Sequence, residues 1–283
     1  MRLCKEHGKI ANKIILNLSH RSIYIKTLSI LGSGWLGLPL ARYFLNIGFQ
    51  VNASTRSAAR FPELKAAGVQ PFVIDIDRLD AAAAKFLQAN ILIINITSKN
   101  LASFSQLISL IEQSSIEKVL FVSSTSVYAN LNKVVTENEG AELKQSPLWQ
   151  IENSFRNNLH FSTTVIRLSG LIGYSRHPGR FFRQGKVVDQ PEAPVNLIHR
   201  DDCIGIISAI IAQDIWGEVF NACADTHPGK REFYTYARKL LDLSPPEFAE
   251  NTENTYKIVS NEKVKRCLNY QFLHADLMQI SFA

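Results

Sequence analysis

Three glycines that follow a short apolar run carry the strongest chemical signal in this chain. Gly32, Gly34 and Gly37 stand in the spacing Gly-x-Gly-x-x-Gly, directly after an apolar segment that ends at Leu31. In a strand–turn–helix unit, the first glycine makes the tight turn, the second lets a pyrophosphate approach the backbone, and the third lets the helix pack on the strand. The N-terminus of the helix then offers N–H groups to the phosphates. A glycine-rich turn without a ligand is the alternative, but the spacing predicts a dinucleotide site, which also includes Ser33, Trp35 and Leu36.

The residues after the next predicted strand indicate which dinucleotide is bound. An acidic residue at this point bonds the ribose 2′-hydroxyl of NAD, whereas an arginine accommodates the 2′-phosphate of NADP. Here the segment is Thr55-Arg56-Ser57, without an acid. Charge-assisted hydrogen bonds of this kind contribute about 1.5–3 kcal/mol. We therefore predict NADP rather than NAD as the preferred cofactor; the alternative is that Arg56 is a solvated loop residue.

Asp75 and Ile76 close the third predicted strand. A carboxylate at this position could accept a hydrogen bond from the adenine amino group. It could equally cap the N-terminus of the following helix. Both residues are included in the predicted cofactor site, with the two roles of Asp75 left open.

The elements that must position these residues alternate regularly. Apolar strands are predicted at 28–31, 50–54, 71–76, 91–96, 119–123 and 161–168, and helices at 37–46, 58–67, 81–88, 103–112 and 147–158. Continuous apolar strands alternating with helices indicate a parallel sheet covered on both faces. We predict an α/β doubly wound (Rossmann) fold, with a dinucleotide-binding core at 27–168. Residues 169–283 would complete the core at about 201–221 and form a small substrate lobe.

The charge of the chain is concentrated at its start. The 283 residues carry a net charge of +6, but residues 1–26 hold six basic residues and one acid, and the rest holds 25 basic against 24 acidic residues. The near-neutral body disfavours nucleic-acid binding. No apolar run approaches the ~18 residues of a membrane span. Residues 1–26 are basic and acid-poor, as a transit peptide would be, but we expect a flexible extension or a start codon assigned too far upstream.

The cysteines predict neither disulfides nor a metal site. Cys4, Cys203, Cys223 and Cys267 form no Cys-x-x-Cys pair and have no histidine at ligand spacing. This usage is typical of reduced thiols in a reducing compartment. We therefore expect a cytoplasmic protein without a structural metal.

A hydroxyl-rich strand end carries a family resemblance. The segment Ser123-Ser124-Thr125-Ser126-Val127-Tyr128, together with the glycine turn, resembles the extended short-chain dehydrogenase/reductases of the NAD-dependent epimerase/dehydratase type. In that family a Ser or Thr four residues before this Tyr hydrogen-bonds the reacting oxygen of the substrate. The resemblance implies that role for Ser124, with Thr125 beside it at the substrate. Ala129 replaces the usual glycine.

The chain lacks the acid/base pair of that family, a Tyr with a Lys four residues later on the next helix. None of its eight tyrosines has a lysine at that spacing, and Glu152 lies in the region where the Lys would be. The standard Tyr–Lys mechanism is therefore not expected. A different group, such as His199 or Tyr128, would have to move the proton.

The C-terminal half narrows the resemblance to an atypical YeeZ-like subgroup that also lacks the pair. The matching segments are 180–182, 193–202, 216–217, 221–225 and 227–228. In this family the loop before the helix at 201 faces the substrate, which implies a substrate-binding role for Asn196 and a cleft position for His199. Arg180 is the predicted ligand for an anionic substrate, although it could also be a solvated loop residue.

Two functions are consistent with the sequence. The first is an NADP-preferring oxidoreductase or epimerase acting on a sugar-nucleotide-like or related hydroxylated small molecule. The second is an NADP(H)-binding sensor or partner-binding protein without turnover, which the missing acid/base pair favours. The family resemblance also implies a homodimer formed through the helices near 103–112 and 147–158.

Overall fold

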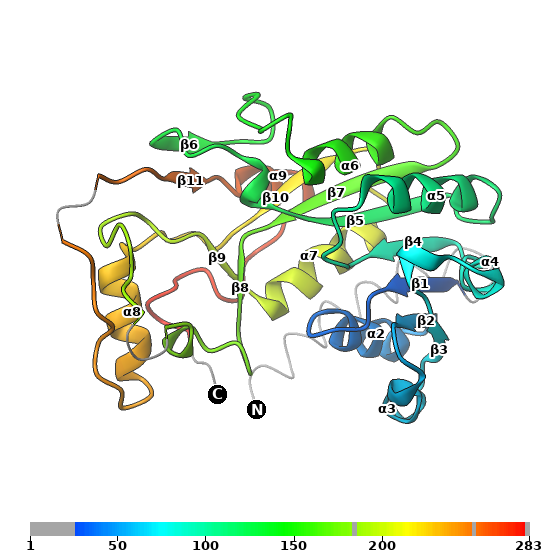
Figure 1. Ribbon diagram of the computed structural model, residues 1–283, viewed down its shortest axis with the longest axis horizontal. Coiled ribbons are helices and arrows are strands. Elements are labelled where there is room, and N and C mark those ends of the chain that lie inside the picture. Colours follow the sequence, from blue (N-terminus) through cyan, green and yellow to red (C-terminus); the bar gives the residue numbers. More distant parts are fainter. Residues whose placement is uncertain (1–25, 183–185, 251–252, 281–283) are drawn as a thin grey trace. The chain divides into compact units, whose positions relative to one another are not determined.

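The computed structural model describes residues 26–182, 186–250 and 253–280 (Figure 1). The predicted N-terminal extension therefore lies outside the described residues, except for its last residue, Lys26. The chain divides into two compact units. One comprises Met1–Val122, Gln150–Val165 and Ile210–Glu218, and the other comprises Ser123–Trp149, Ile166–Ala209 and Val219–Ala283.

A seven-stranded sheet confirms the predicted fold class. Its strand order is β10-β7-β5-β4-β1-β2-β3, and the pairs β1–β2, β2–β3, β1–β4 and β4–β5 are parallel (Figure 1). The strands are β1 (Thr27–Leu31), β2 (Gln50–Thr55), β3 (Gln70–Val73), β4 (Ile91–Ile94), β5 (Lys118–Ser124), β7 (Ser162–Leu168) and β10 (Val219–Ala222). With helices between the strands, this is the doubly wound α/β arrangement.

The strand order reverses between β1 and β4. From β1 the chain builds outward through β2 and β3, and then returns to pair β4 with the other side of β1. Doubly wound sheets bind ligands at the carboxyl ends of the strands at such a switch point. Leu31 and Ile94, which end the two strands, are paired directly. The glycine turn follows Leu31 and therefore lies at the switch point.

The helices largely agree with the predicted ranges. They are α2 (Gly37–Asn46), α3 (Phe61–Ala66), α4 (Ala81–Phe86), α5 (Leu101–Glu112), α6 (Pro147–Arg156) and α7 (Arg200–Gln213). The predicted helix at 58–67 begins instead as a 3-10 turn, η1 (Ala58–Arg60), because Ser57 caps that turn and Pro62 lies in the first turn of α3. β3 ends earlier than predicted, because Asp75 caps the 3-10 turn η2 (Ile76–Arg78).

The second unit contains two small parallel sheets. β8 (Gly170–Ile172) pairs with β9 (Leu197–His199), and β6 (Lys133–Val135) pairs with β11 (Lys257–Val259). The helices α8 (Lys230–Lys239) and α9 (Glu262–Leu268) follow later in the chain. A buried apolar cluster joins β8, β9 and α8 to the C-terminal segment: Ile172, Val195, Leu197, Ala224, Phe233, Leu277 and Ile280.

Among the described residues, no helix combines the length and the apolar character that crossing a membrane requires.

Candidate functional site

The first and third glycines of the turn are required by packing. Gly32 has a φ of +104°, and a Cβ there would lie 2.2 Å from the carbonyl oxygen of Asn95. A Cβ on Gly37 would lie 1.9 Å from the carbonyl oxygen of Gly32. Any larger residue at either position would displace backbone, so both glycines fix the approach of α2 to β1.

The second glycine has a different environment. Gly34 is exposed, and a Cβ on it would meet no atom within 4 Å. The fold itself therefore does not require glycine at this position. A bare backbone at the end of β1 is what the close approach of a pyrophosphate requires.

Backbone and side-chain hydrogen bonds hold the turn against β2. The Gly32 N–H donates to Ser54 Oγ at 2.8 Å, and the Ser33 N–H donates to the Ser54 carbonyl at 3.0 Å. Asn95, which follows β4, donates from Nδ2 to the Gly32 carbonyl at 3.1 Å. The sequence alone does not reveal Asn95, because its role depends on the pairing of β4 with β1.

The start of α2 is left open to an anion. Leu36 occupies the N-cap position without a side-chain hydrogen bond, and the first turn holds no acidic residue. The positive end of the helix dipole is therefore not neutralised by an acid in this turn. Ser33 and Leu36 are buried, whereas Trp35 is half-buried.

The segment after β2 presents an exposed cation. Arg56 is exposed, and Thr55 beside it is buried. Thr55 Oγ1 accepts from the Ser57 N–H at 3.3 Å, and Ser57 Oγ accepts from the Ala59 N–H at 3.3 Å. Both hydroxyls thus already shape the loop that carries Arg56.

A second arginine, which the sequence alone does not single out, contacts the glycine turn. Arg60 Nη1 donates to the Ser33 carbonyl at 2.9 Å and lies 3.3 Å from Ser33 Oγ, while its guanidinium also pairs with Glu63 at 2.9 Å. Its position on the 3-10 turn η1 brings it to the loop. The sequence predicts one uninterrupted helix at 58–67, and that prediction gives no reason to expect the contact.

Asp75 adopts the capping alternative of the two roles left open. Its Oδ1 accepts from the Asp77 N–H at 3.1 Å at the start of η2, and its side chain is exposed. Ile76, the next residue, is buried. A contact of Asp75 with adenine stays a prediction.

Ser124 ends β5 and begins a 3-10 turn. Its Oγ accepts from the Ser126 N–H at 3.1 Å, and the side chain is half-buried. The bond uses an acceptor site of the hydroxyl, so its proton can still be donated. Thr125 beside it is buried. The role of both residues at a substrate stays a prediction.

Tyr128 is held in a buried polar network rather than presented to a substrate. Its hydroxyl donates to Asn221 Oδ1 at 2.8 Å and accepts from Arg167 Nη1 at 2.6 Å. Arg167 also pairs with Glu142 at 2.8 Å. Burial raises the pKa of Tyr128 to about 12, against the opposing effect of Arg167. These contacts favour a structural role and disfavour the predicted proton transfer by Tyr128.

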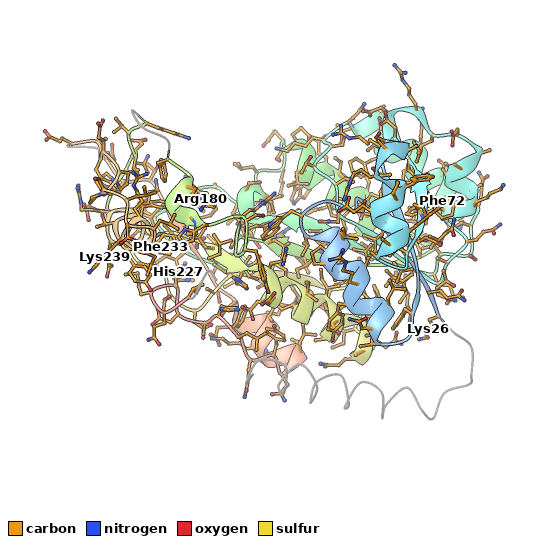
Figure 2. The ribbon with its side chains drawn as sticks, turned by 90° about the horizontal axis from the view of Figure 1, so that it is seen from below. Lys26, Phe72, Arg180, His227, Phe233 and Lys239 are labelled. Atoms are coloured by element: carbon orange, nitrogen blue, oxygen red, sulfur yellow. The ribbon has the colours of Figure 1, made fainter. Side chains whose placement is uncertain are left out.

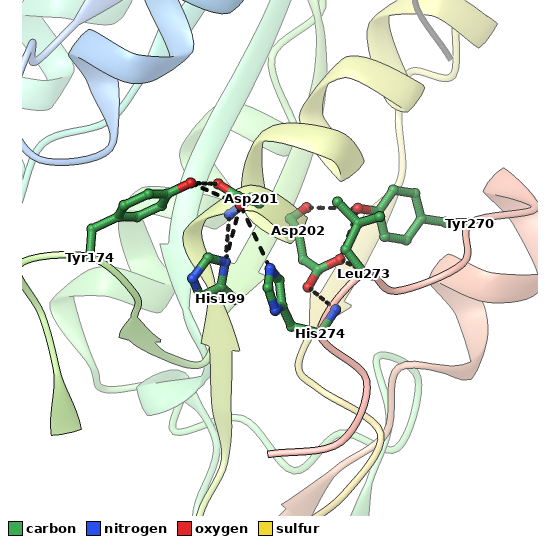
Figure 3. Close-up of polar contacts among 7 residues, drawn as sticks. All are labelled: Tyr174, His199, Asp201, Asp202, Tyr270, Leu273 and His274. Atoms are coloured by element: carbon green, nitrogen blue, oxygen red, sulfur yellow. Dashed lines mark hydrogen bonds and ion pairs between the residues drawn. The ribbon is translucent and has the colours of Figure 1, made fainter. Parts of the chain in front are cut away.

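His199 ends β9 and is almost fully buried. Its Nδ1 accepts from the Asp201 N–H at 3.2 Å, and its ring lies 3.7 Å from that of His274, centroid to centroid (Figure 3). Burial, reinforced by the neighbouring His274, lowers the pKa of His199 to about 4. A neutral His199 at pH 7 is a poor proton donor, which is unfavourable to the acid role that the sequence suggested.

The amide of Asn196 is used to hold another strand. Its Nδ2 donates to the Lys257 carbonyl at 2.8 Å, and its Oδ1 accepts from the Val259 N–H at 2.8 Å. Both ends of the amide thus bind β11, and substrate binding by Asn196 stays a prediction. The sequence could not show this, because β11 is a three-residue strand far away in the chain.

Arg180 is exposed on the 3-10 turn η4 (Pro178–Arg180). This turn contacts α8, the helix of Phe233 (Figure 2). A Cβ on Gly179 would lie 2.5 Å from the Ala237 carbonyl, so the contact is close. Substrate binding by Arg180 stays a prediction.

Comparisons with known proteins agree with the glycine turn and the sheet. A family model described as NAD(P)H-binding matches residues 32–191. Protein YeeZ of Escherichia coli K12 is 30% identical over 277 residues, which cover 89% of this chain and 97% of that protein.

Solved structures show the same fold. A putative NAD-dependent epimerase/dehydratase from Methylobacillus flagellatus is similar with a TM-score of 0.75 and 23% identity, over 89% of this chain and 95% of that one. The UDP-glucuronic acid 4-epimerase of Bacillus cereus in complex with NAD gives a TM-score of 0.70 and 17% identity, over 89% and 96% of the two chains. The chain therefore belongs to the NAD(P)H-binding family and has the α/β fold of the epimerase/dehydratase-like oxidoreductases.

Proposed function

We propose that this protein is an NADP(H)-preferring oxidoreductase or epimerase that acts on a sugar-nucleotide-like or related hydroxylated substrate. The observation that carries the proposal is the glycine turn. Packing requires Gly32 and Gly37, whereas a Cβ at Gly34 would meet nothing within 4 Å. A glycine that the fold does not need, at the switch point of a doubly wound sheet, is explained by a dinucleotide whose pyrophosphate approaches the backbone.

The preference for NADP(H) follows from the charges near β2. The residues at the end of this strand include no carboxylate that could bond a ribose 2′-hydroxyl, and Arg56 is exposed there. Arg60 also reaches the turn through its contact with Ser33, but its charge is paired with Glu63. An exposed cation with no acid at the end of the strand favours a 2′-phosphate over a 2′-hydroxyl.

The substrate class rests on Ser124 and on the relatives. Ser124 would donate a hydrogen bond to the reacting hydroxyl or carbonyl oxygen of the substrate, and so orient it. The nicotinamide supplies the hydride chemistry when it is bound. Sugar nucleotides are proposed as the class because the similar Bacillus cereus structure is a UDP-glucuronic acid 4-epimerase.

A cofactor-binding protein without turnover is the second candidate. No tyrosine has a lysine four residues later, Tyr128 is held by Arg167 and Asn221, and the lowered pKa of His199 leaves it neutral at pH 7. These observations disfavour three sources of a proton. They leave the glycine turn intact, as a sensor of NADP(H) would require.

A substrate screen with matched variants separates the two candidates. The full chain is incubated with NADP⁺ or NADPH and a panel of nucleotide sugars. Nicotinamide absorbance reports net redox turnover, and chromatography of the sugars reports redox-neutral epimerisation. We expect turnover of at least one substrate, and Ser124→Ala should lower kcat by about 10²-fold. The exposed neighbour Ser126 provides the control, because Ser126→Ala should retain activity.

The sensor is the correct account if NADPH binds but no substrate turns over, in either direction. An activity that Ser124→Ala leaves unchanged would contradict the assigned reaction centre.

A further inference from the structure

Three potential metal ligands from distant parts of the chain meet in the second unit. His199 ends β9, Asp201 lies in the first turn of α7, and His274 belongs to the C-terminal segment. Figure 3 shows the two imidazoles beside the Asp201 carboxylate. We call these three residues the His–Asp cluster. The expectation that the protein has no structural metal was based on its cysteines, and none of them belongs to this cluster.

The distances within the cluster are close to those of a coordination sphere. His199 Nδ1 and His274 Nε2 each lie 3.6 Å from Asp201 Oδ2, and the three ligand atoms all lie within 4.8 Å of one another. Ligand atoms that are about 2.0–2.2 Å from a tetrahedral Zn²⁺ are separated by roughly 3.3–3.6 Å. The separations of the two histidine nitrogens from Asp201 Oδ2 therefore fall at the expected value.

His274 Nε2 provides independent support. It is a buried nitrogen that makes no hydrogen bond among the described residues, since Asp201 Oδ2 at 3.6 Å lies just beyond hydrogen-bond distance. Burying a polar atom without a partner costs about 1–3 kcal/mol. A metal ion bound to this nitrogen would remove that cost.

Surrounding contacts orient the ligands. The Tyr174 hydroxyl donates to Asp201 at 2.9 Å from Oδ1 and 3.0 Å from Oδ2, which sets the plane of the carboxylate. Asp202 accepts the N–H of His274 at 3.1 Å and that of Leu273 at 2.7 Å, so the segment that carries His274 is tied to α7. Outer contacts of this type are what hold metal ligands in place in proteins.

The His199 ring is held by its own neighbours. A Cβ on Gly173 would lie 2.3 Å from His199 Nε2, so the backbone of Gly173 packs against that edge of the ring. Nδ1 then points to Asp201, where it accepts a 3.2 Å bond from the backbone N–H. Nδ1 consequently carries a lone pair, which a metal ion would take in place of this long hydrogen bond.

We propose that the His–Asp cluster binds one divalent transition-metal ion of the Zn²⁺ class through two imidazoles and one carboxylate. Three protein ligands leave a coordination position for water or for an oxygen of a small molecule, as in catalytic zinc sites. The side chains of Asp201 and His274 are partly exposed, at 17% and 16%. The inference does not rest on the dinucleotide or on the reaction proposed above.

The charges around the cluster predict its selectivity. Arg200 lies beside it, with its guanidinium 3.7 Å above the Tyr174 ring, and opposes the binding of any cation. One carboxylate next to an arginine attracts Mg²⁺ or Ca²⁺ weakly, since these ions need several oxygen ligands. Affinity must therefore come from the imidazoles, which select Zn²⁺, Co²⁺ and similar ions.

The experiment uses the full chain after removal of bound metal with a chelator. Co²⁺ is titrated and followed by electronic absorption, and Zn²⁺ and Mg²⁺ are titrated by calorimetry. We expect one equivalent of Co²⁺ with visible d–d bands and no thiolate charge-transfer band, displacement by Zn²⁺, and no response to Mg²⁺. His274→Gln and Asp201→Asn should each weaken Zn²⁺ binding more than about tenfold. His160→Ala, which removes an exposed histidine outside the cluster, should bind Zn²⁺ like the wild type.

The proposal is overturned if both cluster variants bind Zn²⁺ as the wild type does, or if Co²⁺ produces a thiolate band, since cysteine would then be the ligand. Circular dichroism of the metal-free variants tests whether they fold. Should His274→Gln fail to fold, paramagnetic NMR of wild-type protein with Co²⁺ decides. Strongly shifted ring protons of His199 and His274 support the site, and their absence refutes it.

Discussion

At the scale of single residues, the clearest finding is the difference between residues that hold the fold and residues that remain available for chemistry. Asn196 and Tyr128 come from segments that resemble those of substrate-binding enzymes, yet their polar groups are occupied by the protein itself. Ser124 and Arg56 keep groups that a ligand can use. A residue type at a familiar position therefore does not establish its role.

Tyr128→Phe tests the structural role of the tyrosine. The substitution removes one hydroxyl and leaves Arg167 Nη1 and Asn221 Oδ1 with one partner fewer in a buried site. We expect the free energy of unfolding to fall by about 1–3 kcal/mol, as measured by urea denaturation. The half-buried Tyr236 is the matched control, since Tyr236→Phe should change stability by less than about 0.5 kcal/mol.

Turnover of the same two variants separates structure from catalysis. If Tyr128 is structural, a Tyr128→Phe variant that remains folded keeps the kcat of the wild type. A stable variant with kcat lowered about 10²-fold or more would instead identify Tyr128 as the group that moves the proton.

Some residues of the candidate site can be predicted from the sequence, and others cannot. The spacing of Gly32, Gly34 and Gly37 is a local pattern, so the amino-acid sequence suffices to recognise it. Asn95 and Arg60 reach the same turn only because β4 pairs with β1 and because a 3-10 turn interrupts the predicted helix. The meeting of His199 with His274 likewise depends on the return of the C-terminal segment.

At the scale of elements, strands are predicted best where they are continuously apolar and fully buried. β4 consists of four buried aliphatic residues, and its predicted ends lie within two residues of the observed ones. β6 and β11 are not predicted, because each has three residues of which only the last is buried, too few to show a periodicity that distinguishes a strand from a loop. The predicted β3 is too long, because the apolar pattern runs on into the 3-10 turn that Asp75 caps.

The unit formed by β1, the glycine turn and α2 allows a direct comparison of two glycines. Gly37→Ala places a methyl group 1.9 Å from the Gly32 carbonyl, which the backbone must relieve by moving. We expect a loss of about 1–3 kcal/mol in stability, measured by chemical denaturation. Gly34→Ala meets no atom of the protein within 4 Å and should leave stability within about 0.5 kcal/mol of the wild type.

Although Gly34→Ala should leave stability unchanged, it should weaken nucleotide binding. A methyl group on the open face of the turn would keep the pyrophosphate away from the backbone, so the Kd for NADPH should rise about tenfold or more. A Gly34→Ala variant that is stable and binds NADPH like the wild type would show that no pyrophosphate approaches this residue.

At the scale of the whole molecule, composition and alternation of elements suffice for the fold class, and the family model and relatives agree with it. The substrate cannot be derived in the same way. The sequence lacks the Tyr–Lys pair that would identify the usual reaction, and the polar groups of Asn196 and Tyr128, which were predicted at the substrate or the reaction centre, are bonded within the fold. The same residue types serve packing and chemistry, so only the contacts of a residue in the structure distinguish the two roles.

Equilibrium titration with NADPH and NADH, followed by quenching of tryptophan fluorescence, tests the NADP(H)-selective dinucleotide site. Wild-type protein should bind NADPH more tightly than NADH. Arg56→Ala should weaken NADPH binding about tenfold or more, because one charge-assisted phosphate contact is lost. NADH binding should stay unchanged. The exposed Arg42 on α2 provides a charge-matched control, since Arg42→Ala should affect neither nucleotide. Equal affinities of the wild type for both nucleotides, or equal losses in Arg56→Ala, would contradict the selectivity, and no binding of either would contradict the site itself.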